Sequence, residues 1–120
     1  MTDAPRPAVA PGGTLCRLAD LEDPGSKEFR IATERGPRSM FVVRKGDAVY
    51  GYMNRCPHTG VTLEWKDDTF LDYDKALIQC SMHGARFVIE TGECISGPCW
   101  KASLARVEVR RDGGAAMGLA

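Results

Sequence analysis

Two short cysteine–histidine pairs constrain this chain more than any other feature of its sequence. Cys56 and His58 stand in RCPHTG, and Cys80 and His83 stand in QCSMHGARF. They include both histidines of the chain. Thiolate sulfur and imidazole nitrogen are side-chain ligands that suit zinc and iron. The two pairs therefore predict one metal centre held between two loops.

Two kinds of metal centre could use these four ligands. A zinc ion would take all four in a tetrahedral site. A [2Fe–2S] cluster with mixed ligation would take two cysteines on one iron and two histidines on the other. Each loop here supplies one cysteine and one histidine, as two facing loops must do if each reaches both irons. The arrangement favours the cluster, and zinc stays open as the alternative.

The sequence around these pairs consists of short strand signals separated by turns that contain glycine. Candidate strands lie at 15–21 and 28–33, a hairpin at 40–54 turns at Lys45-Gly46-Asp47, and a last hairpin follows residue 104. Regular short strands of this kind predict an all-β fold, an antiparallel sandwich or barrel, with helix only in brief turns. Residues 55–99, which carry both pairs, predict a small cluster-binding insert between the hairpins.

Composition limits the domain count, the partners and the compartment. The length of 120 residues fits one domain, which we place at 13–120 behind a flexible tail at 1–12 rich in proline and alanine. A formal net charge of zero argues against a nucleic-acid partner. We find no apolar run long enough for a membrane span and no apolar core of a signal peptide. Five cysteines without a paired framework fit a reducing compartment, so we expect a cytoplasmic protein, and we favour a monomer.

Together, RCPHTG, IQCSMHGARF and the later TGECISGPC resemble the Rieske-type [2Fe–2S] ferredoxins and Rieske domain proteins, from about Leu15 to Leu119. The resemblance implies a single Rieske domain with one cluster. It implies that Cys56 and Cys80 bind the inner iron, and that His58 and His83 bind the outer, solvent-facing iron. Gly97-Pro98 would match the loop that covers one side of the cluster in this family.

The resemblance also bears on the reduction potential. High-potential members of the family have serine and tyrosine hydroxyls that donate to the cluster sulfurs, and a disulfide between the two loops. The matching positions are Ala85 and Phe87 for the hydroxyls, and Val61 and Met82 for the disulfide. Alanine and phenylalanine have no donor. We therefore expect a low potential, towards the negative end of the Rieske range of about −150 to +300 mV.

The expected role is that of a one-electron carrier and not of an enzyme. Ring-oxygenating family members hold a further iron with two more histidines and a carboxylate, and this chain has no third histidine. We expect electrons to pass from a flavin-dependent reductase to a terminal oxygenase or similar acceptor. The alternatives are a small subunit or module of a larger redox enzyme, such as a nitrite-reductase-like assembly, and a structural zinc domain.

Several other residues admit a functional and an ordinary explanation. Cys94 and Cys99 could form a redox dithiol, but small buried side chains are the preferred interpretation, as for Cys16. Trp65 and Trp100 could rim the site, although core packing is commoner. The acidic spacer, Asp67, Asp68, Asp72 and Asp74, could steer a basic reductase, although such a run is most often a solvated loop.

Overall fold

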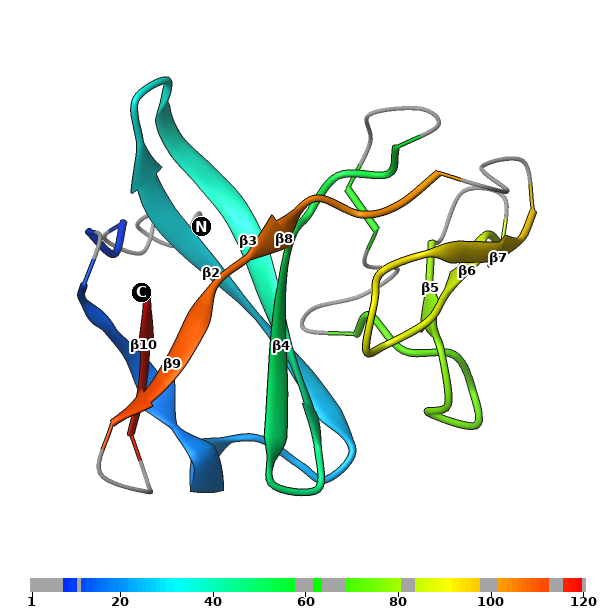
Figure 1. Cartoon of the computed structure of the whole chain (residues 1–120), viewed down its shortest axis with the longest axis horizontal. Helices are drawn as coiled ribbons and strands as arrows, with labels where there is room; N and C mark the ends of the chain where they lie inside the picture. The colour runs from blue at the N-terminus through cyan, green and yellow to red at the C-terminus, as the bar shows by residue number, and fades with distance from the viewer. Residues whose placement is uncertain are drawn as a thin grey trace, which may run out of the picture.

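The computed structural model describes residues 8–10, 12–57, 62–63, 69–80, 84–97, 102–112 and 116–119. It is built of antiparallel strands in three small sheets, ordered β1-β10-β9, β2-β3-β4-β8 and β5-β6-β7 (Figure 1). This confirms the all-β prediction. In chain order the elements are β1 (Thr14–Arg17), the 3-10 turn η1 (Leu18–Asp20), β2 (Gly25–Thr33), β3 (Gly36–Lys45), β4 (Ala48–Met53), β5 (Ile78–Gln79), β6 (Arg86–Phe87), β7 (Cys94–Ser96), β8 (Arg106–Val107), β9 (Val109–Asp112) and β10 (Ala116–Leu119).

The longest ladders belong to β2, β3 and β4. β2 pairs with β3 from Gly25 opposite Arg44 to Thr33 opposite Gly36, and β3 pairs with β4 as far as Lys45 opposite Ala48. The tight turn at Gly46-Asp47 confirms the predicted hairpin, and Gly46 has a φ of +63°, which favours glycine. β2 begins three residues before the predicted 28–33.

The C-terminal strands join the first two sheets. β8 pairs with β4, whereas β9, separated from β8 only by Glu108, pairs with β10. β10 in turn pairs with β1. The chain thus passes from one sheet to the other between neighbouring strands (Figure 1). We call these two sheets the base, and β5–β7 with the segments around them the cluster-binding subdomain.

Strand β3 is buried on both faces. Met40 and Val42 pack into the core of the base with residues of β2, whereas Phe41 and Val43 pack into a second core shared with the cluster-binding subdomain. Successive side chains of a strand point to opposite faces, so both faces of β3 need apolar residues. This explains the unbroken run from Met40 to Val43.

The N-terminal region differs from its prediction in detail. The strand predicted at 15–21 ends at Arg17, and the chain turns through η1. The Arg44 guanidinium donates to the carbonyl oxygens of Leu18 and Leu21 at 3.2 and 3.1 Å, which holds this turn against β3. Val9, in the predicted tail, bridges to Ile31 of β2. The division into a 1–12 tail and a 13–120 domain stays a prediction.

Within the described ranges, the structure has no helix long and apolar enough to cross a membrane.

Candidate metal centre

The two cysteines of the predicted ligand set lie in one apolar core. Cys56 comes three residues after β4 and is 3% exposed, and Cys80 follows β5 directly and is 1% exposed. Both belong to the core between β3 and the cluster-binding subdomain. His58 and His83 lie outside the described residues, so the structure brings together two of the four predicted ligands and leaves the other two untested. The described residues accordingly contain no cluster of three or more possible metal ligands.

The second loop is the tip of a hairpin. β5 and β6 pair through Ile78 opposite Phe87 and Gln79 opposite Arg86. At the end of this ladder the Cys80 N–H donates to the Ala85 carbonyl at 2.8 Å, and the Gly84 N–H donates to the Cys80 carbonyl at 3.2 Å. Gly84 has a φ of +66°, which allows this tight return. These two hydrogen bonds therefore hold Cys80 against Gly84 and Ala85.

The first loop is closed by Asn54, the one polar side chain counted as buried among the described residues, at 5% exposure. Its Oδ1 accepts the Leu63 N–H at 2.8 Å, and its Nδ2 donates to Ser39 Oγ at 3.0 Å. Ser39 Oγ in turn donates to the Glu28 carboxylate. Asn54 thus bonds to Leu63, at the far end of the segment that contains Cys56, and to Ser39 of β3. Sequence reasoning missed Asn54, because an asparagine at the end of a strand is no distinctive signal.

The segment predicted to cover the cluster contacts the second loop. Gly97 has a φ of +98°, and a Cβ at this position would lie 2.8 Å from the Ala85 Cα. Only glycine allows so close an approach of the two backbones. Pro98 and Trp100, like Trp65, lie outside the described residues.

Two of the four positions that the family resemblance linked to the reduction potential are described. Ala85 and Phe87 are buried in the same core as Cys80, and neither has a hydroxyl group. Val61 and Met82, the positions that match the inter-loop disulfide, lie outside the described residues.

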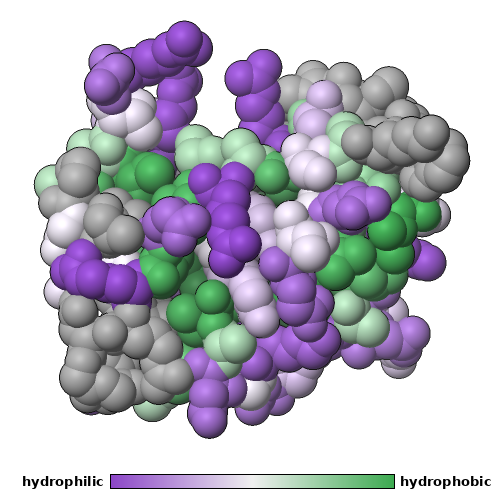
Figure 2. Space-filling view, in the orientation of Figure 1, coloured by the Kyte–Doolittle hydropathy of each residue, from purple (hydrophilic) through white to green (hydrophobic). Residues whose placement is uncertain are grey.

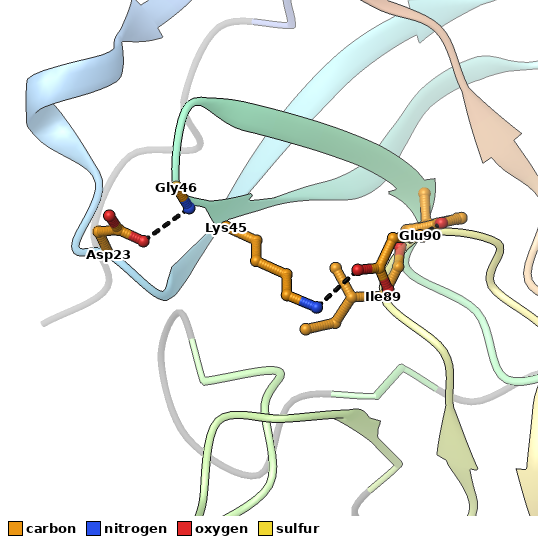
Figure 3. Close-up of polar contacts among 6 residues, drawn as sticks. Asp23, Lys45, Gly46, Ile89 and Glu90 are labelled. Atoms are coloured by element: carbon orange, nitrogen blue, oxygen red, sulfur yellow. Dashed lines mark hydrogen bonds and ion pairs between the residues drawn. The ribbon is translucent and has the colours of Figure 1, made fainter.

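Three contacts fix the cluster-binding subdomain against β3 and β4. Phe41 stacks on Phe70 with ring centroids 4.2 Å apart. The Tyr52 O–H donates to the Ile89 carbonyl at 2.6 Å, and burial raises the pKa of Tyr52 to about 12. At the surface, Lys45 at the end of β3 reaches Glu90 at 2.6 Å (Figure 3).

The same end of β3 is also tied to the N-terminal part of the base. The Gly46 N–H donates to the Asp23 carboxylate at 2.8 Å (Figure 3). The β3–β4 turn therefore connects the segment before β2 with the turn after β6.

The remaining cysteines follow the ordinary interpretation where they are described. Cys94 is buried in the core that holds Cys56 and Cys80, and its thiol donates to the Ser96 carbonyl at 3.3 Å. Cys16 is half-buried against the base core, and burial raises the pKa of its thiol. Cys99 lies outside the described residues, so the dithiol idea stays untested.

The acidic spacer contributes to local structure. The Asp72 carboxylate accepts the N–H groups of Ala76 and Leu77 at 2.9 and 3.3 Å, which closes a turn before β5. Asp67 and Asp68 lie outside the described residues. Asp72 therefore has a structural role in its own loop, and the steering of a reductase by the acidic spacer stays untested.

The described donor atoms fit an iron–sulfur cluster. Among the described residues, Cys16, Cys56, Cys80 and Cys94 are not joined in disulfides. Cys56 and Cys80 come from different loops and are shielded from water by the same apolar residues, among them Phe87 and Leu63. Such surroundings suit thiolate ligands of iron, which they protect from solvent.

Comparison with known proteins gives a consistent result. The ferredoxin of carbazole 1,9a-dioxygenase from Nocardioides aromaticivorans IC177 has a TM-score of 0.67 at 24% identity, over 87% of this chain and 94% of that one. A Sphingomonas yanoikuyae B1 ferredoxin has a TM-score of 0.60 at 24% identity, with coverages of 86% and 92%. A complex of reduced oxygenase and oxidized ferredoxin in carbazole 1,9a-dioxygenase matches with a TM-score of 0.64 at 25% identity, with coverages of 87% and 88%.

No curated protein sequence matches the chain. The family model for the Rieske [2Fe-2S] domain, by contrast, matches residues 14–109, from the first residue of β1 to the first residue of β9. This span includes both cysteine–histidine pairs and most of the base. The chain therefore belongs to the Rieske [2Fe-2S] domain family.

Proposed function

We propose that this protein is a one-electron carrier of low reduction potential, which takes electrons from a flavin-dependent reductase and passes them to a terminal oxygenase or similar acceptor. The observation that carries the proposal is the meeting of Cys56 and Cys80 in one buried core at the ends of two loops. A [2Fe–2S] cluster, when bound, accepts and releases single electrons. The ferredoxin of carbazole 1,9a-dioxygenase and the Sphingomonas yanoikuyae B1 ferredoxin share this fold, which supports a carrier role and not an enzymatic one.

The proposed ligands are Cys56 and Cys80 for one iron and His58 and His83 for the other. The described backbone supports this assignment, because Asn54 closes the first loop and the Cys80–Ala85 hydrogen bond closes the second. The chain's own part is to hold both loops in place and to keep the thiolates dry.

Chemical and spectroscopic measurements test the assignment directly. We expect the protein, prepared without oxygen, to contain iron and acid-labile sulfide in equal amounts and to give a Rieske-type EPR signal after dithionite reduction. His58→Ala and His83→Ala should each abolish that signal, whereas the matched variants Cys94→Ala and Cys16→Ala should keep it. Stoichiometric zinc without sulfide would exclude the carrier function.

We further propose that the carrier is a cytoplasmic monomer and that residues 13–120 form its single domain. The described cysteines are not joined in disulfides, which suits a reducing compartment. Cell fractionation tests the compartment, and light scattering of the cluster-containing protein tests the monomer. Recovery in the periplasm, or a stable dimer, would contradict them.

A further inference from the structure

A groove runs beside the first loop of the candidate centre. Its walls come from the β2–β3 turn, the segment after β4 and the segment before β8. In the view of Figure 2, hydrophilic side chains stand on both sides of a hollow at the top of the molecule, where Figure 1 shows the β2–β3 turn. The described residues that line the groove are Thr33, Glu34, Arg35, Pro37, Arg38, Ser39, Met53, Asn54, Arg55, Pro57, Thr62, Ser103 and Ala105.

The groove is positively charged although the chain as a whole is neutral. Three arginines, Arg35, Arg38 and Arg55, and a single acidic residue, Glu34, line it. All three arginines are exposed, and none forms an ion pair with a described residue. By contrast, Lys45 and Lys75, which are also exposed, are each paired with a carboxylate. The unpaired guanidinium groups are therefore available to an anionic partner.

The lining of the groove suits an extended peptide segment. Met53, Pro57 and Ala105 contribute apolar side chains to it, and Thr33, Thr62 and Ser103 contribute hydroxyl groups. With a volume of about 830 Å³, the groove is too large to be filled by a single small anion. A peptide with several acidic side chains could lie along it and contact arginines from both walls. Guanidinium groups bind carboxylates through two parallel hydrogen bonds.

The β3 side of the groove is not an edge for strand addition. β3 pairs with β4 only from Met40 onward. Pro37 lies before Met40, on the part of β3 that has no pairing with β4. Proline offers no N–H to an added strand, and such residues protect exposed edges. Recognition here would therefore depend on side chains, with charge as the main selector.

We propose that this groove docks an acidic segment of the protein's redox partner and so places that partner against the first loop. The proposal rests on the proposed carrier function, because Pro57 in the groove wall directly precedes His58. It assigns the positive groove, and not the acidic spacer, as the charged surface that selects the partner. Electrostatic selection of this kind raises association rates and weakens with salt.

The first test measures binding and does not depend on electron transfer. A peptide of alternating glutamate and alanine is titrated into the isotopically labelled full chain at low ionic strength, and amide shifts are followed by NMR. We expect shifts at the groove residues, and binding at least about tenfold weaker in the combined variant Arg35→Glu, Arg38→Glu, Arg55→Glu. Arg17→Glu, an exposed charge reversal in β1, should bind as the wild type does. Shifts elsewhere, or equal binding by the combined variant, would overturn the proposal.

The second test asks whether the groove lies on the electron route. The reduced protein gives one electron to ferricyanide, which becomes ferrocyanide, or to hexaammineruthenium(III), which becomes ruthenium(II). We expect the combined variant to react more slowly with the anionic oxidant and faster with the cationic one, with Arg17→Glu unchanged. Equal rates in all variants would reject the groove as a docking site. A wild-type protein that cannot be reduced at all would instead reject the carrier function, while leaving the peptide result intact.

Discussion

The base and the cluster-binding subdomain hold their shapes in different ways. β2 and β3 run for nine and ten residues and are paired along most of their length. β5, β6 and β7 have only two or three residues each. Such short ladders supply few backbone hydrogen bonds, so the subdomain depends on its packing against β3. We therefore expect the base to be stable by itself, and the subdomain to be ordered only when it packs against the base.

The largest expected effect comes from removing the ring that joins the two regions. Phe70→Ala deletes a fully buried side chain stacked on Phe41, and such substitutions cost about 3–5 kcal/mol of unfolding free energy. We also expect a lower cluster content, because Phe70 packs in the core that holds the thiols. Phe29→Ala, in the base core, is the matched control and should lower stability while leaving the cluster content of the folded protein normal. Urea unfolding and iron analysis check both, and equal cluster loss in the two variants would break the comparison.

A second large effect should appear at alkaline pH. Burial raises the pKa of Tyr52 from 10.0 to about 12, so the unfolded chain releases this proton at lower pH than the folded one. The raised pKa leaves the free energy of unfolding at its full value below about pH 10. That free energy then falls by about 3 kcal/mol in total as the pH rises towards 12. Unfolding free energies measured across this range in wild type and Tyr52→Phe check it. The variant lacks the Ile89 hydrogen bond at every pH but should lack this alkaline loss; the same loss in both would refute the assignment to Tyr52.

A matched glycine pair separates backbone strain from close packing. Gly36 and Gly97 have similar φ values, +94° and +98°, but an added Cβ meets nothing within 4 Å at Gly36 and a backbone atom at 2.8 Å at Gly97. Gly36→Ala should cost about 1–2 kcal/mol from strain alone. Gly97→Ala should cost about 1–3 kcal/mol more and change the visible circular dichroism of the cluster. Equal losses of thermal stability would show that Ala85 moves aside easily.

A smaller effect concerns the reduction potential. Phe87→Tyr and Ala85→Ser add hydroxyl groups at buried positions of the subdomain. A hydrogen bond that favours the reduced state by about 1 kcal/mol would raise the midpoint potential by about 40 mV. Protein-film voltammetry measures this, with Phe29→Tyr in the base as the control that should leave the potential unchanged. A wild-type midpoint well above zero would contradict the low potential expected from these two residues.

The smallest effect is expected from the surface ion pair of Lys45 and Glu90. The hydrogen bond from Lys45 is the main cause that lowers the pKa of Glu90, so the pair stabilises the fold above the ordinary glutamate pKa and loses its effect as the pH falls through the lowered value. Both groups are largely exposed, and exposed pairs contribute little. Glu90→Gln should lower the thermal midpoint less than any variant above, and salt should remove the difference. A loss as large as that of Phe70→Ala would mean that the subdomain is held mainly by charge.

Local chemistry was enough to predict some of these features and not others. The Gly46-Asp47 turn, the all-β architecture and the burial of Cys94 follow from residue types and short spacings. The burial of both faces of β3 was not predicted, because a run of apolar residues such as Met40–Val43 does not indicate which segment covers the second face. Asn54 and the arginine groove were missed for the same reason, since their partners come from strands and loops far away in the sequence. The three arginines of the groove also show that a net charge of zero does not describe the charge of a local surface.

The two-sided burial of β3 has a practical consequence for anyone who engineers this protein. Odd-numbered and even-numbered positions between Met40 and Val43 act on different cores. Substitutions at Phe41 and Val43 would tune the surroundings of the thiols, while substitutions at Met40 and Val42 would adjust the scaffold beneath. Substitutions in this one strand can thus change either core separately.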